Sequence, residues 1–220
     1  MEVLDALRKE LVEHDTKLIA VSKTKPNEQI VELYEKGQRA FGENKVQELV
    51  AKQEALPKDI EWHLIGHLQT NKVKYVAPFV HLIHAVDSLK LLKEIQKQAA
   101  KNKRTISVLL QMHIADEESK FGLDKAALTE IVEYYTAPES PFTNIKICGL
   151  MGMATFTEDK KQVQKEFASL KDLFIFCKES YLLKEDFSEI SMGMSGDYKI
   201  AMQEGSTMVR IGSMLFGARN

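Results

Sequence analysis

Lys23 ends a short apolar run, KLIAVSK (17–23), and stands just before the turn-forming sequence TKP (24–26). Alternate side chains of an extended strand share a face, so Lys23 points the same way as Ile19 and Val21, toward the packed side. Burial lowers the pKa of a lysine because the charged form loses hydration. A partly neutral amine can condense with a carbonyl compound to form a Schiff base. The position predicts that chemistry, although most lysines at strand ends are simply solvated.

A second group of chemically useful residues lies near the end of the chain, in SMGMSGD (191–197) and MVRIGS (208–213). Glycine lets a backbone N–H approach a phosphate closely, and serine hydroxyls add hydrogen-bond donors. An arginine inside an apolar strand needs a partner, because an unpaired buried charge is costly. These segments predict an anion site whose candidate residues are Ser191, Ser195, Arg210, Gly212 and Ser213.

The histidines form two spaced pairs, His63 with His67 and His81 with His84. The first spacing would suit a metal on a helix, but residues 62–65 read as a strand and no carboxylate stands at a ligand spacing. We therefore expect no metal site. The phosphate-loop, HExxH, CxxC and GxSxG patterns are also missing, which weakens readings as a nucleotide triphosphatase, metalloprotease, thiol oxidoreductase or hydrolase.

Strand-like and helical patterns alternate along the whole chain, which predicts parallel strands joined by helical crossovers. The expected strands are 18–23, 39–42, 62–65, 81–86, 106–114, 145–151, 189–192 and 208–211. The expected helices are 3–14, 27–36, 45–55, 71–76, 88–101, 125–135, 160–179 and 198–204, with starts near Asn27, Ser88 and Thr157.

Eight short β/α units favour a (β/α)8 barrel over a doubly wound sheet, although periodicity alone does not separate the two. No compositional break divides the chain, so we expect one domain over residues 1–220. In such a barrel the working face lies at the C-terminal ends of the strands. Lys23 and the residues of the anion site all fall at those ends.

Composition narrows the classes of partner. Lys plus Arg total 30 against 32 for Asp plus Glu, a net charge of −2, which disfavours nucleic acid and anionic membranes. Cys148 and Cys177 each lie in an apolar stretch, as buried cysteines in a reducing compartment do. The charged, amphipathic first residues do not resemble a signal peptide, and no apolar run is long enough for a membrane span. We therefore expect a soluble, cytoplasmic protein.

Several longer motifs, in order, resemble the YggS/PROSC family of proteins that bind pyridoxal 5'-phosphate (PLP) and maintain its homeostasis. They cover nearly the whole chain: AVSKTKP (20–26), FGENKVQE (41–48), WHLIGHLQTNK (62–72), ESKFG (118–122), GLMGM (149–153), SMGMSGD (191–197) and GSTMVRIGSMLFGAR (205–219). The resemblance implies a single (β/α)8 barrel similar to the N-terminal domain of alanine racemase, which agrees with the strand count.

The resemblance also implies roles for individual residues. Lys23 would hold PLP as a Schiff base, and Arg210 would face the pyridine nitrogen. Ser195, Gly212 and Ser213 would hold the phosphate. Nearer the ring, the resemblance suggests Asn44, His67 and Met151.

Arg210 indicates binding rather than catalysis. Arginine only donates hydrogen bonds, so it keeps the pyridine nitrogen unprotonated and makes the ring a poorer electron sink. Racemases of this fold add a tyrosine base from a second domain of the partner subunit. Residue 220 follows soon after the last motif, so we expect that domain to be absent. The expected protein is a monomer that buffers PLP or delivers it transiently to apo-PLP enzymes, without robust catalysis.

Two other functions remain open from sequence. One is a weak PLP-dependent racemase or decarboxylase whose base is His67 or Tyr198. The other is a barrel enzyme acting on a sugar phosphate, with Lys23 as its Schiff-base lysine.

Overall fold

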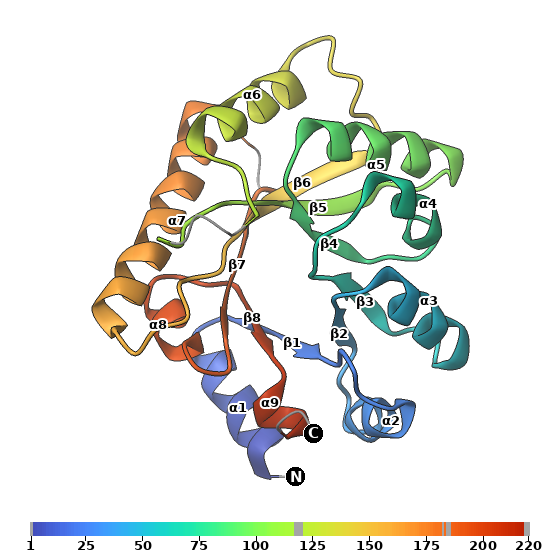
Figure 1. The fold of residues 1–220 in the computed structure, drawn as a ribbon, viewed down its shortest axis with the longest axis vertical. Coiled ribbons are helices and arrows are strands. Elements are labelled where there is room, and N and C mark those ends of the chain that lie inside the picture. Colours follow the sequence, from blue (N-terminus) through green and yellow to red (C-terminus); the bar gives the residue numbers. More distant parts are fainter. Residues whose placement is uncertain (1, 117–120, 182, 184–185, 218–220) are drawn as a thin grey trace.

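All the strands of the computed structural model, which describes residues 2–116, 121–181, 183 and 186–217, run parallel and pair in sequence order from β1 to β8. β8 pairs with β1, so the sheet closes into a barrel, and helices surround it (Figure 1). Closure confirms the predicted barrel and excludes the doubly wound sheet. Residues 118–120 of the ESKFG motif and 218–219 of the last motif lie outside the described residues.

Seven of the eight observed strands have the same core as the expected segments, with ends that differ by at most two residues. The strands are β1 (Lys17–Val21), β2 (Ala40–Glu43), β3 (Glu61–Leu64), β4 (Leu82–Val86), β5 (Ile106–Gln111), β6 (Ile145–Met151), β7 (Glu189–Met194) and β8 (Met208–Ile211). β5 is three residues shorter than expected. The backbone of Leu123 bonds to Gln111 and His113 there, so another segment takes the place of the strand's continuation.

The helices also follow the predicted pattern. They are α1 (Glu2–Glu13), α2 (Asn27–Glu35), α3 (Val46–Ala55), η1 (Thr70–Lys72), α4 (Val73–Val76), α5 (Leu89–Lys101), α6 (Lys125–Thr136), α7 (Lys160–Ser180), α8 (Tyr198–Gln203) and α9 (Ser213–Phe216). Ser88 caps α5 as predicted, accepting a hydrogen bond from the Leu91 N–H at 3.2 Å. The predicted first residues of α2 and α7 are also confirmed, but the N-cap position is occupied by Pro26 rather than Asn27 in α2, and by Asp159 rather than Thr157 in α7.

Apolar side chains pack in two layers, as the strand pleat requires. One layer fills the barrel interior and contains Ile19, Leu82, Ala85, Leu109, Cys148, Met151 and Met208. The other, larger layer lies between the strands and the surrounding helices and includes Leu18 and Ala20 of β1. Ile19 therefore faces inward while its neighbours face the helices, which is the alternation from which the direction of Lys23 was predicted.

The pairing of β8 with β1 sets the position of Arg210. Ile19 is the register partner of Arg210, and the next pair joins Ala20 to Ile211. Arg210 consequently enters the barrel from the same side as Ile19, two residues below the end of β1. Among the described helices, none is long and apolar enough to cross a membrane.

Candidate functional site

A cavity of about 630 Å³ opens at the C-terminal ends of the strands. Its wall contains residues from the loops after β1, β2, β3, β5, β6, β7 and β8. Seven of the nine predicted site residues line it: Lys23, Asn44, His67, Ser195, Arg210, Gly212 and Ser213. Side chains more than 180 residues apart in the sequence thus meet around one space, as the barrel topology predicts.

Lys23 lies in the turn directly after β1 and lines the cavity together with Val21. The next residue, Thr24, has a φ of 63°, in the left-handed region that β-branched residues rarely adopt. The chain therefore turns sharply at Lys23. A conformation of this kind persists only when the surrounding structure holds it.

Side chains of β2 and α3 hold that turn on both sides of Lys23. The Lys52 ammonium donates to the Ser22 carbonyl at 2.7 Å and to Oε1 of Glu43 at 2.8 Å. Glu48 accepts a hydrogen bond from the Thr24 N–H at 2.6 Å. We call Glu43, Glu48 and Lys52 the turn clamp.

The turn clamp is largely buried. Glu43 is fully buried, and Ser22 donates its hydroxyl to the Glu43 carboxylate at 2.5 Å. Burial raises the pKa of the Glu43 carboxyl, against the lowering effects of Lys52 and Ser22. Because a buried carboxylate needs a cationic partner, Lys52 keeps Glu43 compatible with the folded state.

Arg210 is the buried cation on the cavity wall. Its guanidinium donates to Ser191 Oγ at 2.7 Å and to the Gly152 carbonyl at 3.0 Å. Burial lowers its pKa to about 10, while Asp197 acts in the opposite direction, so Arg210 stays protonated at neutral pH. Its anchors are neutral acceptors, which leave the positive charge available to a ligand.

The predicted anion loops approach each other at the ends of β7 and β8. The Gly212 N–H donates to Ser195 Oγ at 3.3 Å, which ties the two loops together. A Cβ at Gly212 would lie 3.3 Å from the Val21 carbonyl, so a side chain there would crowd β1. Ser213 is exposed and begins α9. This end of the cavity presents hydroxyls and backbone groups rather than bulky side chains.

The wall opposite the anion loops comes from β2, β3 and the segment after β5. The His67 imidazole bonds to Asp87 at 3.0 Å and stacks on Phe121, with ring centroids 4.7 Å apart. A Cβ at Gly66 would lie 2.5 Å from the Asn44 carbonyl oxygen. Only glycine therefore lets the β3 loop approach Asn44 closely enough to form this wall.

Two predicted site residues lie behind the wall rather than on it. Met151 is fully buried in the barrel interior. Ser191 is also fully buried, where it accepts from Arg210 and lies 2.9 Å from His84 Nδ1. Ser191 thus orients Arg210 instead of lining the cavity.

Tyr198, one of the two candidate bases, is also absent from the wall. Its hydroxyl donates to Glu10 of α1 at 2.9 Å. Burial and the bond to Glu10 raise the pKa of this phenol.

Sequence reasoning missed several residues of the wall. Lys25 lines the cavity and donates to the Phe216 carbonyl at 2.9 Å, which joins the β1 loop to α9. Phe121 and Phe156 add exposed aromatic surface. Phe121 belongs to the ESKFG motif and Lys25 to the AVSKTKP motif. Both motifs were recognised, so these two residues could have been included among the predicted site residues.

The electrostatic balance of the cavity favours an anion. Its wall carries the cationic side chains of Lys23, Lys25 and Arg210 and the carboxylate of Asp197. A small ligand with a phosphate and a carbonyl group fits this set, since it could pair with the cations while an amine reacts at the carbonyl.

Comparisons with known proteins agree with this geometry. The family described as "Alanine racemase, N-terminal domain" matches residues 4–220. A pyridoxal phosphate homeostasis protein of Aquifex aeolicus is 43% identical over 94% of this chain and 89% of its own length. The human protein of the same name is 38% identical, over 93% of this chain and 77% of its own.

Solved structures give the same result. PipY of Synechococcus elongatus, a COG0325 family member, superposes with a TM-score of 0.91 without PLP and 0.89 with PLP bound. Both are 35% identical and cover 98% of this chain and 99% of theirs. Alanine racemase of Bartonella henselae shares the fold, with a TM-score of 0.71 at 19% identity over 99% of this chain and 59% of that one.

The fold and the site define a barrel of the alanine racemase N-terminal-domain class. Within that class, the chain belongs to the family of pyridoxal phosphate homeostasis proteins.

Proposed function

We propose that this protein binds PLP through a Schiff base on Lys23 and acts in PLP homeostasis as a buffer or carrier of the cofactor. The observation that carries the proposal is the single cavity in which Lys23, Arg210 and the loops of Ser195 and Gly212 meet. Relatives named for PLP homeostasis and the PLP-bound PipY structure support it.

The residues of the cavity fit PLP. Its volume of about 630 Å³ lies within the usual range for a small-molecule site. The phosphate would lie against Ser195, Gly212 and Ser213, where a Cβ at Gly212 would crowd Val21. PLP supplies an aldehyde for the amine and a ring that can accept electrons. Arg210 would face the ring nitrogen.

We also propose that the protein lacks robust catalysis. A guanidinium has no acceptor, so Arg210 cannot hold a proton on the pyridine nitrogen as a carboxylate does. Tyr198, which could have served as a base, is bonded to Glu10 outside the cavity. The proposal extends to a single domain over 1–220, a cytoplasmic monomer and transient transfer of PLP to apo-PLP enzymes.

Absorbance and trapping test the covalent site. The purified protein is expected to be yellow, and borohydride should fix PLP on the peptide that contains Lys23. Lys23→Ala should abolish both signals. Lys25→Ala is the matched control, since Lys25 lines the same cavity and should leave the adduct on Lys23. Retention of the adduct by Lys23→Ala would overturn the assignment. A colourless protein would favour the sugar-phosphate alternative.

One observation favours a second function, weak PLP-dependent catalysis. His67 lines the cavity and is oriented by Asp87, the arrangement of a general base with its partner. Incubation with L-amino acids in deuterated water separates the two functions. We expect no turnover-scale exchange at Cα. Exchange that His67→Gln removes would establish the enzyme instead.

A further inference from the structure

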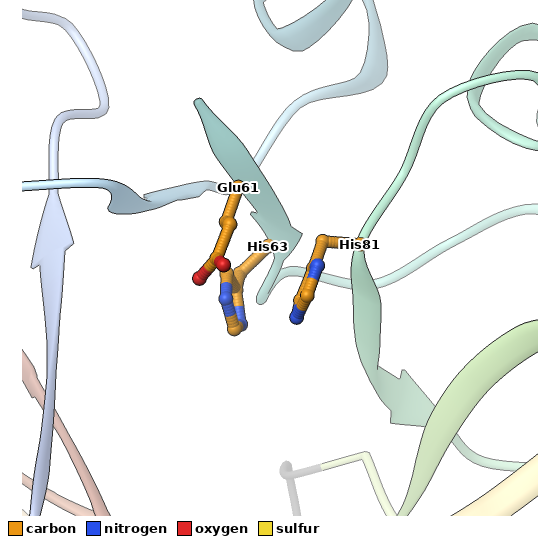
Figure 2. A group of neighbouring side chains, drawn as sticks. All are labelled: Glu61, His63 and His81. Carbon is orange, nitrogen blue, oxygen red and sulfur yellow. The ribbon is translucent and has the colours of Figure 1, made fainter. Parts of the chain in front are cut away.

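A cluster of potential metal ligands lies at the end of the barrel opposite the cavity. Glu61 begins β3 and His63 follows two residues later, so both side chains project from the same face of that strand. His81 precedes β4 and donates its backbone N–H to the Trp62 carbonyl at 2.9 Å, which brings it beside them. Figure 2 shows the three side chains side by side, two from β3 and His81 from the segment that leads into β4.

The geometry of the cluster suits a cation. One ligand atom from each of Glu61, His63 and His81 lies within 4.8 Å of the other two. Glu61 and His81 are exposed, whereas His63 is only 3% exposed. The cluster therefore combines one fixed ligand with two that can rotate.

His63 provides a second, independent sign of a ligand. Its Nε2 is buried and has no hydrogen-bond partner among the described residues. Its other nitrogen, Nδ1, lies 2.9 Å from Nε2 of His84. A buried polar atom without a partner is costly, so Nε2 is the atom in this region that a bound group would satisfy.

The hydrogen-bond chain behind His63 decides what Nε2 can offer. His84 Nδ1 lies 2.9 Å from Ser191 Oγ, which accepts from Arg210 at 2.7 Å. Both imidazoles are buried, His84 completely. When His63 Nδ1–H donates to His84 and His84 Nδ1–H to Ser191, the His63 Nε2 carries a free lone pair.

We propose that Glu61, His63 and His81 form a site for a divalent transition metal of the Zn²⁺ class, with water completing the coordination. Two imidazoles and one carboxylate are a donor set that Zn²⁺ takes in proteins. A histidine ligand normally donates its second N–H to another group, and His84 Nε2, 2.9 Å from His63 Nδ1, can accept that hydrogen bond. The proposal reverses the expectation from sequence, which found no carboxylate at a ligand spacing and so overlooked Glu61, two residues before His63.

Binding requires a modest closure. Ligand atoms about 2.1 Å from one Zn²⁺ in a tetrahedron are about 3.4 Å apart. The exposed side chains of Glu61 and His81 can move toward His63, which its bond to His84 holds in place. The ammonium of Lys17, at the start of the neighbouring part of the barrel, is paired with Glu189 at 2.5 Å, which offsets its repulsion of a cation.

The site is separate from the proposed PLP site and does not depend on it. Glu61 and His81 lie where β3 and β4 begin, whereas the cavity lies where the strands end. The chain through His84 and Ser191 connects the proposed metal to Arg210 across the barrel interior. Failure of PLP binding would leave the metal proposal standing, and the reverse also holds.

Titration of the purified protein with Zn²⁺, followed by calorimetry, tests the proposal. We expect one equivalent to bind, and Co²⁺ in its place to give the visible absorption of a low-symmetry, four- or five-coordinate site. Glu61→Ala and His81→Ala should each weaken binding by at least about tenfold. Both changes are at exposed positions, so the core that contains His63 is left intact.

His14→Ala is the matched control, because His14 is exposed and lies outside the cluster. It should bind Zn²⁺ as the wild type does. The proposal is wrong if the wild type shows no saturable equivalent, or if Glu61→Ala and His81→Ala bind as tightly as His14→Ala. Repeating the titration with borohydride-fixed protein keeps the PLP content equal across variants, so loss of PLP cannot mimic loss of the metal site.

Discussion

The Lys52 ammonium donates to the backbone carbonyl of Ser22 at 2.7 Å, so a side chain of α3 holds the residue that precedes Lys23. Glu48, on the same helix, accepts from the Thr24 N–H and from Lys52. The backbone is thus fixed on both sides of Lys23. The amine of a covalent cofactor site must be held in position, and here α3 supplies that support.

Lys52→Met removes the cation of the turn clamp and leaves Glu43 buried without its partner. Breaking a buried pair costs about 3–5 kcal/mol, so the free energy of unfolding should fall by that amount. Urea denaturation measures the change. Lys97→Met is the control. The Lys97 side chain is 74% exposed, and its ammonium lies as far as 3.9 Å from the Glu94 carboxylate, so this ion pair is weak. That variant should stay within about 0.5 kcal/mol of the wild type.

The double variant Glu43→Gln with Lys52→Met should recover part of the loss, since the fully buried residue 43 no longer carries a charge without a partner, and only the partly exposed Glu48 has lost its ammonium partner. Equal stability of the Lys52→Met and Lys97→Met proteins would contradict a structural role for the turn clamp.

Ser191→Ala tests the anchoring of Arg210. The guanidinium loses the acceptor at 2.7 Å, and a hydrogen bond to a charged group contributes about 1.5–3 kcal/mol. We expect the free energy of unfolding to fall by about that amount and PLP to bind more weakly. Ser169→Ala is the control, because Ser169 is an exposed residue whose hydroxyl donates only to the uncharged Glu166 carbonyl at 2.8 Å. A Ser191→Ala protein with unchanged stability and unchanged PLP affinity would show that Arg210 is held by other contacts.

The barrel was predictable because its signals are local. Each strand is an apolar run and each helix is an amphipathic run. In α5, for example, both the Ser88 cap and the buried apolar face could be predicted from the sequence. α9 was missed because four residues are too few to show a period. β7 extends past its predicted end to Met194 through Gly193, where φ is 94° and the pairing register shifts.

The site was predictable only in part, for a related reason. Lys23, Arg210 and Gly212 stand at strand ends, where topology alone places them on the working face. Ser191 lies inside β7 and faces the barrel interior. The SMGMSGD motif suggested that Ser191 lines the cavity, but the side chain lies one layer of residues below the cavity wall. Lys52 could not be recognised at all. Its role depends on how α3 packs against the turn after β1, a contact between segments 30 residues apart.

Gly149→Ala tests the close approach of β6 and β7. A Cβ at Gly149 would lie 1.7 Å from the Glu189 carbonyl oxygen, and φ there is 154°. The strands must separate, so we expect a loss of more than about 4 kcal/mol or no soluble protein. Gly37→Ala is the matched control, since its φ is also positive but nothing lies within 4 Å of the added atom. It should cost about 1–2 kcal/mol. Similar unfolding midpoints for the two variants would exclude the steric argument.

Cys177 should make stability depend on alkaline pH. The side chain is buried in α7, and burial raises the pKa of its thiol to about 11 from an ordinary value of 9.0. Between those values the unfolded chain releases the thiol proton while the folded chain keeps it, so the folded state loses stability as pH rises. From pH 8 to pH 10 this amounts to about 1.3 kcal/mol.

Cys177→Ala isolates this contribution from other groups that titrate in the same range. The alanine variant should be less stable than the wild type at pH 8 because it leaves a small cavity. The difference in the free energy of unfolding between wild type and Cys177→Ala should shrink by about 1.3 kcal/mol at pH 10, where the wild type has lost the contribution of the protonated thiol. Urea denaturation of both proteins at the two pH values measures the difference. A stability difference that is the same at both pH values would mean that the thiol ionises equally in the folded and unfolded chains. Solvent would then reach Cys177 in the native state.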